Sequence, residues 1–161
     1  MNVNKEKQKD FARRITQANR SELLVVTYDI LLEEIEASKR SFDAGDAAEY
    51  ARAIKSAQRF IAELMSTLDF AYPISKEIFA LYEYVQRLLI KSDITRRPFE
   101  LDSAVYVISG LRKSYAHLAA EDDSAPLMEN TQTVFAGLTY GKGTLNETDL
   151  DPNAVNRGFL A

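Results

Sequence analysis

The 161-residue sequence contains no cysteine, no tryptophan and a single histidine, His117. Without cysteine the chain can form neither a disulfide framework nor a thiolate metal site. No apolar run approaches the roughly 18 residues needed to cross a bilayer. The polar N-terminus, MNVNKEKQKD, also lacks the apolar stretch of a signal peptide. We therefore expect a cytoplasmic protein without a membrane span.

Charge is distributed unevenly along the chain. Residues 121–161 contain seven acidic and two basic residues, a net charge of −5, so the other 120 residues carry +1 of the total of −4. Nucleic acids are bound through clusters of lysine and arginine that neutralise phosphates. A nearly neutral body without a basic stripe argues against nucleic acid as a partner.

The residue types that carry catalysis are scarce. With a single histidine, a histidine-based catalytic triad lacks partners. A di-iron bundle would need two Glu-x-x-His motifs, but Ser114, and not a glutamate, stands three residues before His117. Residues 137–144 resemble a phosphate loop, but the spacing is one residue short and no strand precedes it. Residues 149–153 resemble the start of a calcium loop, but Ala154 occupies the glycine position. We predict no enzymatic activity, no metal and no cofactor.

Two segments, residues 20–44 and 47–68, carry apolar residues at steps of three, four and seven, which is helical spacing. Side chains that cap helix starts precede both segments, and a glycine separates them, where a left-handed residue ends a helix at little cost. The expected starts and end are Asn19 with Glu22, Asp46 with Glu49, and Gly45.

Two further helices are expected before residue 120. Ser75 is the expected cap of the third, which carries Ile78 and Tyr82, and Pro98 suits the first turn of the fourth, where its missing N–H would be unpaired anyway. No segment up to residue 120 alternates with the period of a strand, and the connections are short. The sequence therefore predicts an all-α protein, an antiparallel up-down four-helix bundle with a long C-terminal tail.

We expect three parts: a polar N-terminal segment (1–19), the bundle (20–120) and an acidic, glycine-rich tail (121–161). The tail is too polar to form its own core. Its apolar residues gather at two places, and such a tethered segment could cover an apolar groove on the bundle. The alternatives are an acidic solubility tail and docking on a neighbouring molecule. The apolar residues concerned are Val134, Phe135, Leu138, Phe159 and Leu160.

Several stretches, in order and spacing, resemble the flagellar secretion chaperones of the FliS family. Residues 19–29 (NRSELLVVTYD) are similar to the first-helix motif, approximately SPEELxxxLYD, and residues 64–69 (LMSTLD) resemble the family's LrstLD. Residues 74–88 resemble the pattern iS…LYdYm.rrL of the third helix, and Leu111-Arg112 stands in the place of the fourth-helix motif. The resemblance covers about residues 10–120.

The sequence departs from the family pattern at several positions. Arg20 stands where proline is usual, Ile30 where glycine is common, and Tyr115 near the place of a frequent tryptophan. The family's N-terminal tyrosine has no clear counterpart, although Phe11 is adjacent to its place.

The resemblance implies an export chaperone that binds the C-terminal helical segment of flagellin, prevents premature polymerisation and delivers flagellin to the flagellar export apparatus by type III secretion. An amphipathic segment of that kind could bind as a helix in a groove. The alternative from another class is a structural or assembly bundle that self-associates through its tail, without a flagellin client.

Excess width of the apolar helix faces predicts which residues hold the partner, since a bundle helix needs only one apolar stripe. The other interpretation of the same residues is a wide core face. Two of them, Phe11 and Ile15, could cover the groove when it is empty. The predicted partner-binding residues are Phe11, Ile15, Leu23, Val26, Ile30, Ala53, Phe60, Tyr84 and Leu88.

Overall fold

The computed structural model describes residues 3–128, and these residues form five α-helices without a strand. The all-α class is therefore confirmed, but the count of four helices was wrong, because the polar N-terminal segment contributes a helix of its own. The helices are α1 (Val3–Gln17), α2 (Arg20–Asp43), α3 (Ala47–Ser66), α4 (Ile74–Thr95) and α5 (Leu101–Ala120).

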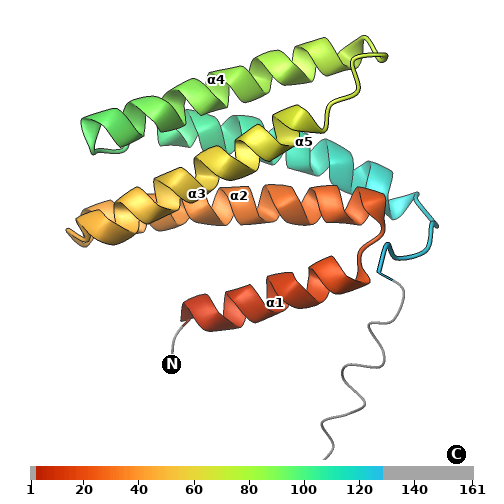
Figure 1. Cartoon of the computed structure of the whole chain (residues 1–161), viewed down its shortest axis with the longest axis horizontal. Coiled ribbons are helices and arrows are strands. Elements are labelled where there is room, and N and C mark those ends of the chain that lie inside the picture. The colour runs from red at the N-terminus through yellow and green to blue at the C-terminus, as the bar shows by residue number, and fades with distance from the viewer. Residues whose placement is uncertain (1–2, 129–161) are drawn as a thin grey trace, which may run out of the picture. The chain divides into compact units, whose positions relative to one another are not determined.

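Successive helices run in opposite directions (Figure 1). Helix α2 packs against α3 and α5, and α4 also packs against α3 and α5, so these helices enclose a shared core. Helix α1 lies outside them, and its extensive packing is with α2 (Figure 1). The fully covered centre of the core includes Leu31, Ile35, Ile54, Ile61, Leu89 and Ile108.

The predicted starts of the first two helices and the turn between them are confirmed. The side chain of Asn19 accepts a hydrogen bond from the Glu22 N–H (2.8 Å), and the Glu22 carboxylate accepts one from the Asn19 N–H (3.0 Å). Asp46 caps α3 by accepting from the Glu49 N–H (3.0 Å). Gly45 has a φ of +72°, the left-handed conformation that the turn between α2 and α3 requires.

Two predicted helix starts were wrong. Helix α4 begins at Ile74, and the buried Ser75 donates its hydroxyl to the Asp69 carbonyl (2.6 Å) instead of capping the helix. Pro98 lies in the turn before α5, which starts at Leu101 after Glu100 in a left-handed conformation. The spacing of residues in the sequence does not specify which backbone group a serine hydroxyl bonds, or how many residues a turn takes before its helix begins.

A tyrosine pair is buried in the core. The hydroxyls of Tyr28 on α2 and Tyr82 on α4 hydrogen-bond to each other, and both side chains are at most 1% exposed. The ring of Tyr28 also lies 5.5 Å from that of Tyr115 on α5. One hydrogen bond thus satisfies two buried hydroxyls from two helices that do not pack extensively on each other.

After α5 the chain turns back toward the start of α2. We call residues 121–128 the strap. Most of the predicted tail, including its two apolar groups, lies outside the described residues. The expectation that the tail covers a groove concerns those residues. No helix among residues 3–128 is long and apolar enough to cross a membrane.

Candidate functional site

Helix α1 is held on α2 by two ion pairs. Lys7 Nζ lies 2.7 Å from Glu33 Oε2, and Arg14 Nη2 lies 2.5 Å from Asp29 Oδ2. Phe11, between the two cations on the same face of α1, is half-buried, and the Arg14 guanidinium lies 5.9 Å from its ring centre. The contact between α1 and α2 therefore combines two ion pairs with a half-buried aromatic side chain.

Asp29 joins three helices. Besides Arg14 of α1 it accepts hydrogen bonds from Arg112 of α5, at 2.8 Å to Oδ1 and 3.3 Å to Oδ2. Burial alone would raise the pKa of the Asp29 carboxyl, but the hydrogen bonds from Arg112 and Arg14 outweigh it and hold that pKa below its ordinary value. The aspartate therefore stays charged at neutral pH and ties α1 to the bundle.

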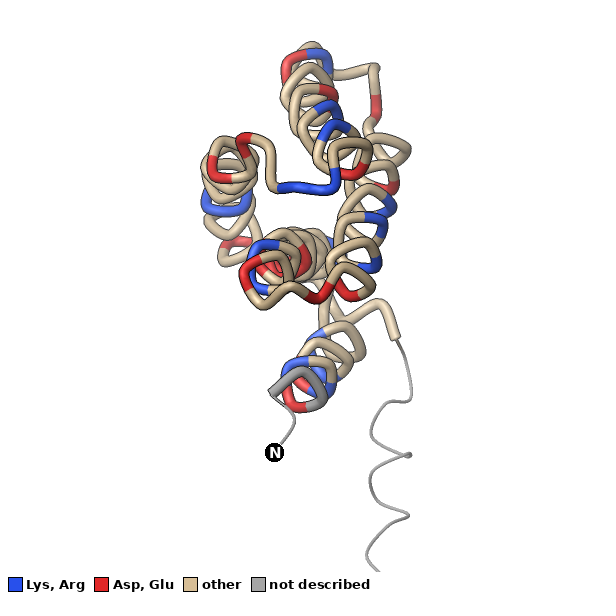
Figure 2. Tube along the Cα trace, turned by 90° about the vertical axis from the view of Figure 1, so that its left-hand side faces the viewer, with Lys and Arg blue, Asp and Glu red and all other residues tan. Residues whose placement is uncertain are grey.

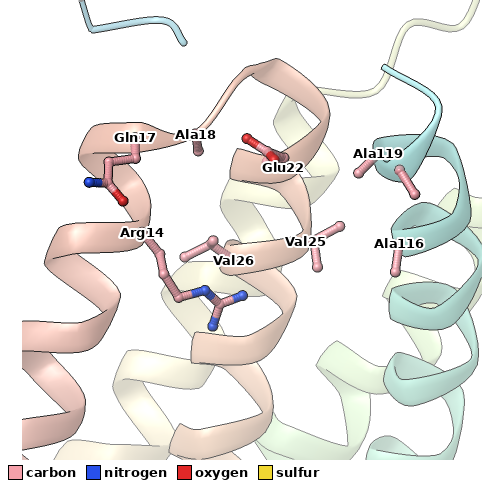
Figure 3. A pocket seen from close by; sticks show the side chains of 9 residues that line it. Arg14, Gln17, Ala18, Glu22, Val25, Val26, Ala116 and Ala119 are labelled. Carbon is pink, nitrogen blue, oxygen red and sulfur yellow. The ribbon is translucent and has the colours of Figure 1, made fainter. Parts of the chain in front are cut away.

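A hollow of about 550 Å³ lies between α1 and α5, with α2 as its floor (Figure 3). Small apolar side chains of α2 and α5 share the lining about equally with polar side chains of α1 and α2. Val25 and Val26 of the floor are buried although they do not belong to the main core cluster. The lining residues are Arg14, Gln17, Ala18, Glu22, Val25, Val26, Ala116, Ala119 and Ala120.

The strap fastens the junction between α1 and α2, at one end of this hollow. The Leu127 N–H donates to the Ala18 carbonyl (3.0 Å), and the Asn19 side-chain amide donates to the Asp122 carbonyl (2.9 Å). The hydroxyl of Ser21 donates to the Asp122 carboxylate. Asn19 thus caps α2 with its oxygen and binds the strap with its nitrogen.

A second, smaller hollow of about 230 Å³ lies where the α3–α4 loop meets α2 and α5. Tyr72 and Ile74 on its rim are exposed, whereas Tyr82 in its lining belongs to the core. Among residues 3–128, no three histidine, cysteine or acidic side chains are grouped so that they could hold a metal ion.

The chain matches the family model described as flagellar protein FliS over residues 2–122. It belongs to the FliS family. This is a chaperone family of the flagellum and not a family of enzymes. No curated protein matches the chain. The match ends at Asp122, so most of the strap lies beyond the part that the FliS family model covers.

The predicted partner-binding residues of this FliS protein fall into two groups. In the first group Phe11 and Ile15 of α1 are half-buried, as are Leu23 and Ile30 of α2, while Val26 is only 3% exposed. Val26 lies in the floor of the hollow, between α1 and α2 (Figure 3). The helix that carries Phe11 and Ile15 packs on α2, the helix that carries Leu23, Val26 and Ile30.

The second group belongs to α3 and α4. Ala53 is fully buried, Leu88 belongs to the core cluster, and Phe60 and Tyr84 pack against its edge. Helix α1 packs extensively on α2 alone, so the structure does not gather all nine residues into one groove. Ala53 and Leu88 offer no surface to a partner while the helices keep this arrangement. Their side chains widen the apolar faces of α3 and α4 that pack in the core.

Several residues of the site were missed from the sequence. Asp29 and Arg112 are 83 positions apart, and no local pattern predicts that they meet. Arg14 was not singled out, and Glu22 was predicted only as part of the helix cap. One signal was available: Ala116, Ala119 and Ala120 follow the three- and four-residue spacing that places small side chains on one helix face.

Proposed function

We propose that this FliS-family chain is a cytoplasmic export chaperone that binds the C-terminal helical segment of flagellin. Binding prevents premature polymerisation and presents flagellin to the export apparatus for flagellar type III secretion. Membership of a flagellar chaperone family supports the proposal. The observation that carries it is the hollow over Val25 and Val26, where small apolar side chains lie beside polar ones, so that it can receive an amphipathic helix.

The lining favours a helix over other ligands. Ala116 and Ala119 on α5 are short side chains, so a helix lying on α2 beside α5 can approach the α5 backbone closely (Figure 3). Glu22 is exposed and stays hydrated, and Arg14 is paired with Asp29. Acidic and basic residues are distributed over all five helices (Figure 2), so no single-sign field draws a nucleic acid to this surface.

Helix α1 serves as an internal cover for the α2 surface, with Phe11 and Ile15 as its apolar contacts. The Lys7–Glu33 pair that helps to hold α1 is exposed, and an exposed ion pair contributes only about 0.2–1 kcal/mol. A client that buries more apolar surface on α2 gains about 25 cal/mol for each additional Å². Such a client can displace α1, even though the tether gives α1 an effective concentration of roughly millimolar.

Chaperoning of this kind needs no chemical step. A flagellin segment held on the chaperone is withdrawn from polymerisation by mass action, and export removes it from the complex. Partner binding is assigned mainly to the α2 residues of the predicted set, Leu23, Val26 and Ile30. Phe11 and Ile15 of α1 cover them until the client binds. No nucleotide site enters the proposal.

Titration calorimetry with monomeric flagellin from the same cell tests the proposal. Ala119→Leu fills the hollow, and overpacking costs about 1–3 kcal/mol, or about five- to 150-fold in affinity. The matched control is Ala80→Leu, the same substitution on the exposed face of α4. We expect only Ala119→Leu to weaken binding and to lose protection against flagellin polymerisation, as followed by light scattering.

Equal binding by the two variants would mean that the client uses another surface. Absence of any complex between flagellin and the native chain would contradict the proposed function itself. Concentration-dependent self-association without flagellin binding, seen by sedimentation, would instead favour the structural or assembly protein that self-associates.

A further inference from the structure

The face that α2 turns toward α1 carries carboxylates at helical spacing. Glu22, Asp29 and Glu33 follow one another at steps of seven and four residues, with Val26 between the first two. Helix α1 opposes this face with two basic residues, Lys7 and Arg14. The pairing is thus a cationic amphipathic helix on an acidic and apolar surface.

Asp29 and Glu33 divide their oxygens in the same way. Oε1 of Glu33 accepts from the resident Arg40 of α2 at 2.7 Å, and its Oε2 accepts from Lys7 of α1 at 2.7 Å. Of the two hydrogen bonds that Arg112 donates to Asp29, the shorter goes to Oδ1, and Oδ2 accepts from Arg14 of α1. In each carboxylate a bundle arginine orients the group and a second oxygen is directed to the docked helix.

The spacing of the two cations fixes how a helix lies on this face. Lys7 and Arg14 are seven residues apart and lie on one side of α1, with Phe11 four residues after Lys7. Arg14, later in α1, pairs with Asp29, which comes earlier in α2 than Glu33. The docked helix is therefore antiparallel to α2, with an aromatic side chain between two cations.

Exposed ion pairs contribute little to affinity, but they select register, direction and partner. A helix with acidic residues at these positions would meet Glu22, Asp29 and Glu33 and be repelled, which is a source of specificity. The two oriented oxygens stay in place when α1 leaves, because Arg40 and Arg112 belong to α2 and α5.

We propose that α1 mimics the client, and that the flagellin segment docks on α2 as an antiparallel helix with two basic residues about seven positions apart. These residues replace Lys7 and Arg14 on Glu33 Oε2 and Asp29 Oδ2, and a large apolar side chain between them replaces Phe11. This inference rests on the proposed function and adds the charge pattern that the client must carry.

The test measures flagellin affinity by titration calorimetry in a Lys7→Gln background, where α1 no longer competes for Glu33. In the native chain a change of Glu33 would weaken the docking of α1 as well as the binding of the client. Because α1 competes with the client, the two changes would have opposite effects on the measured affinity. Against this background, Glu33→Gln is expected to weaken binding about two- to five-fold. Glu33→Lys is expected to weaken it further and to reduce its dependence on salt.

Glu34→Gln is the matched control, because Glu34 lies next in sequence but pairs with Arg52 of α3 through both oxygens. It should leave the affinity unchanged. A flagellin variant with one basic residue of its C-terminal segment changed to glutamate should restore binding to the Glu33→Lys chaperone.

The outcomes separate the inference from the function on which it rests. If Glu33→Gln binds flagellin as tightly as Glu34→Gln in the Lys7→Gln background, or more tightly, the charge pattern is wrong and flagellin binding stands. If the native chain forms no complex with flagellin, the proposed function fails. Denaturation midpoints of all variants show whether a loss of binding reflects unfolding.

Discussion

The buried tyrosine pair permits a quantitative test of the core. Tyr28 and Tyr82 donate and accept a single hydrogen bond between their hydroxyls, and no other partner for either hydroxyl is found among residues 3–128. Tyr28→Phe leaves the Tyr82 hydroxyl buried and unpaired, and Tyr82→Phe does the same to Tyr28. An orphaned buried hydroxyl costs about 1–3 kcal/mol, so each single change should lower the free energy of unfolding by that amount.

The double variant removes both hydroxyls and leaves nothing unpaired. Its free energy of unfolding should therefore be lower than that of the native chain by less than either single variant's loss, with a coupling of about 1–3 kcal/mol between the sites. Urea unfolding followed by far-UV circular dichroism measures all three, since the chain has no tryptophan to report fluorescence. Tyr106→Phe, at an 82% exposed side chain on α5, is the control and should change little.

The same pair predicts how alkali affects stability. Burial, the largest cause, raises the pKa of Tyr82 from 10.0 to about 12, and it raises the pKa of Tyr28 further. The folded state therefore favours the neutral phenols, and the stability that they contribute is complete below pH 10 and is lost as the pH rises toward 12. The double phenylalanine variant should lose less stability across this window. A double variant whose loss equals the sum of the two single losses would refute the pairing.

Three further changes address the core, the helix α5 and the ion pairs that hold α1. Ile61→Ala should lower the free energy of unfolding by about 2–5 kcal/mol in urea, because the side chain is fully buried; an unchanged midpoint would remove it from the core. Gly110→Ala should raise that free energy by about 0.5–1 kcal/mol, since an added Cβ meets no atom within 4 Å, and a lower melting temperature would contradict this. Asp29→Asn should lower it by about 1–2 kcal/mol at neutral pH and speed tryptic cleavage of α1. Because the pKa of Asp29 is lowered from 3.8, this difference should shrink as the pH falls below about 4; a pH-independent difference would argue against the ion pairs.

Local chemistry predicted the parts of the fold that depend on neighbours in sequence. The capping box at Asn19 and the left-handed glycine at Gly45 need only residues within one turn, and both are present. Ser75 shows the limit of such reasoning, because its hydroxyl could bond to the backbone in more than one way and found the Asp69 carbonyl. The spacing of apolar residues also depends on neighbours in sequence, and it predicted four of the five helices.

Helix α1 and the site required contacts that sequence spacing does not encode. With Phe11 and Ile15 as its isolated apolar residues, α1 has too weak an apolar face to be predicted as a packed helix. Its docking depends on Glu33 and Asp29, 26 and 15 residues away from their partners in α1. The sequence therefore predicted the apolar residues that α2 contributes to the candidate site, but not the charges beside them.

The strap makes the two ends of the described chain thermodynamically dependent on each other. Leu127 is bonded to the carbonyl of Ala18, the residue that follows α1, and Asp122 is bonded to the next residue, Asn19. Any event that pulls the strap away from this junction also removes a restraint on the direction in which α1 leaves α2. By reciprocity, any free energy that the strap adds to the docking of α1 is also added by docked α1 to the hold on the strap. The last described residues are therefore held at the same junction at which α1 ends.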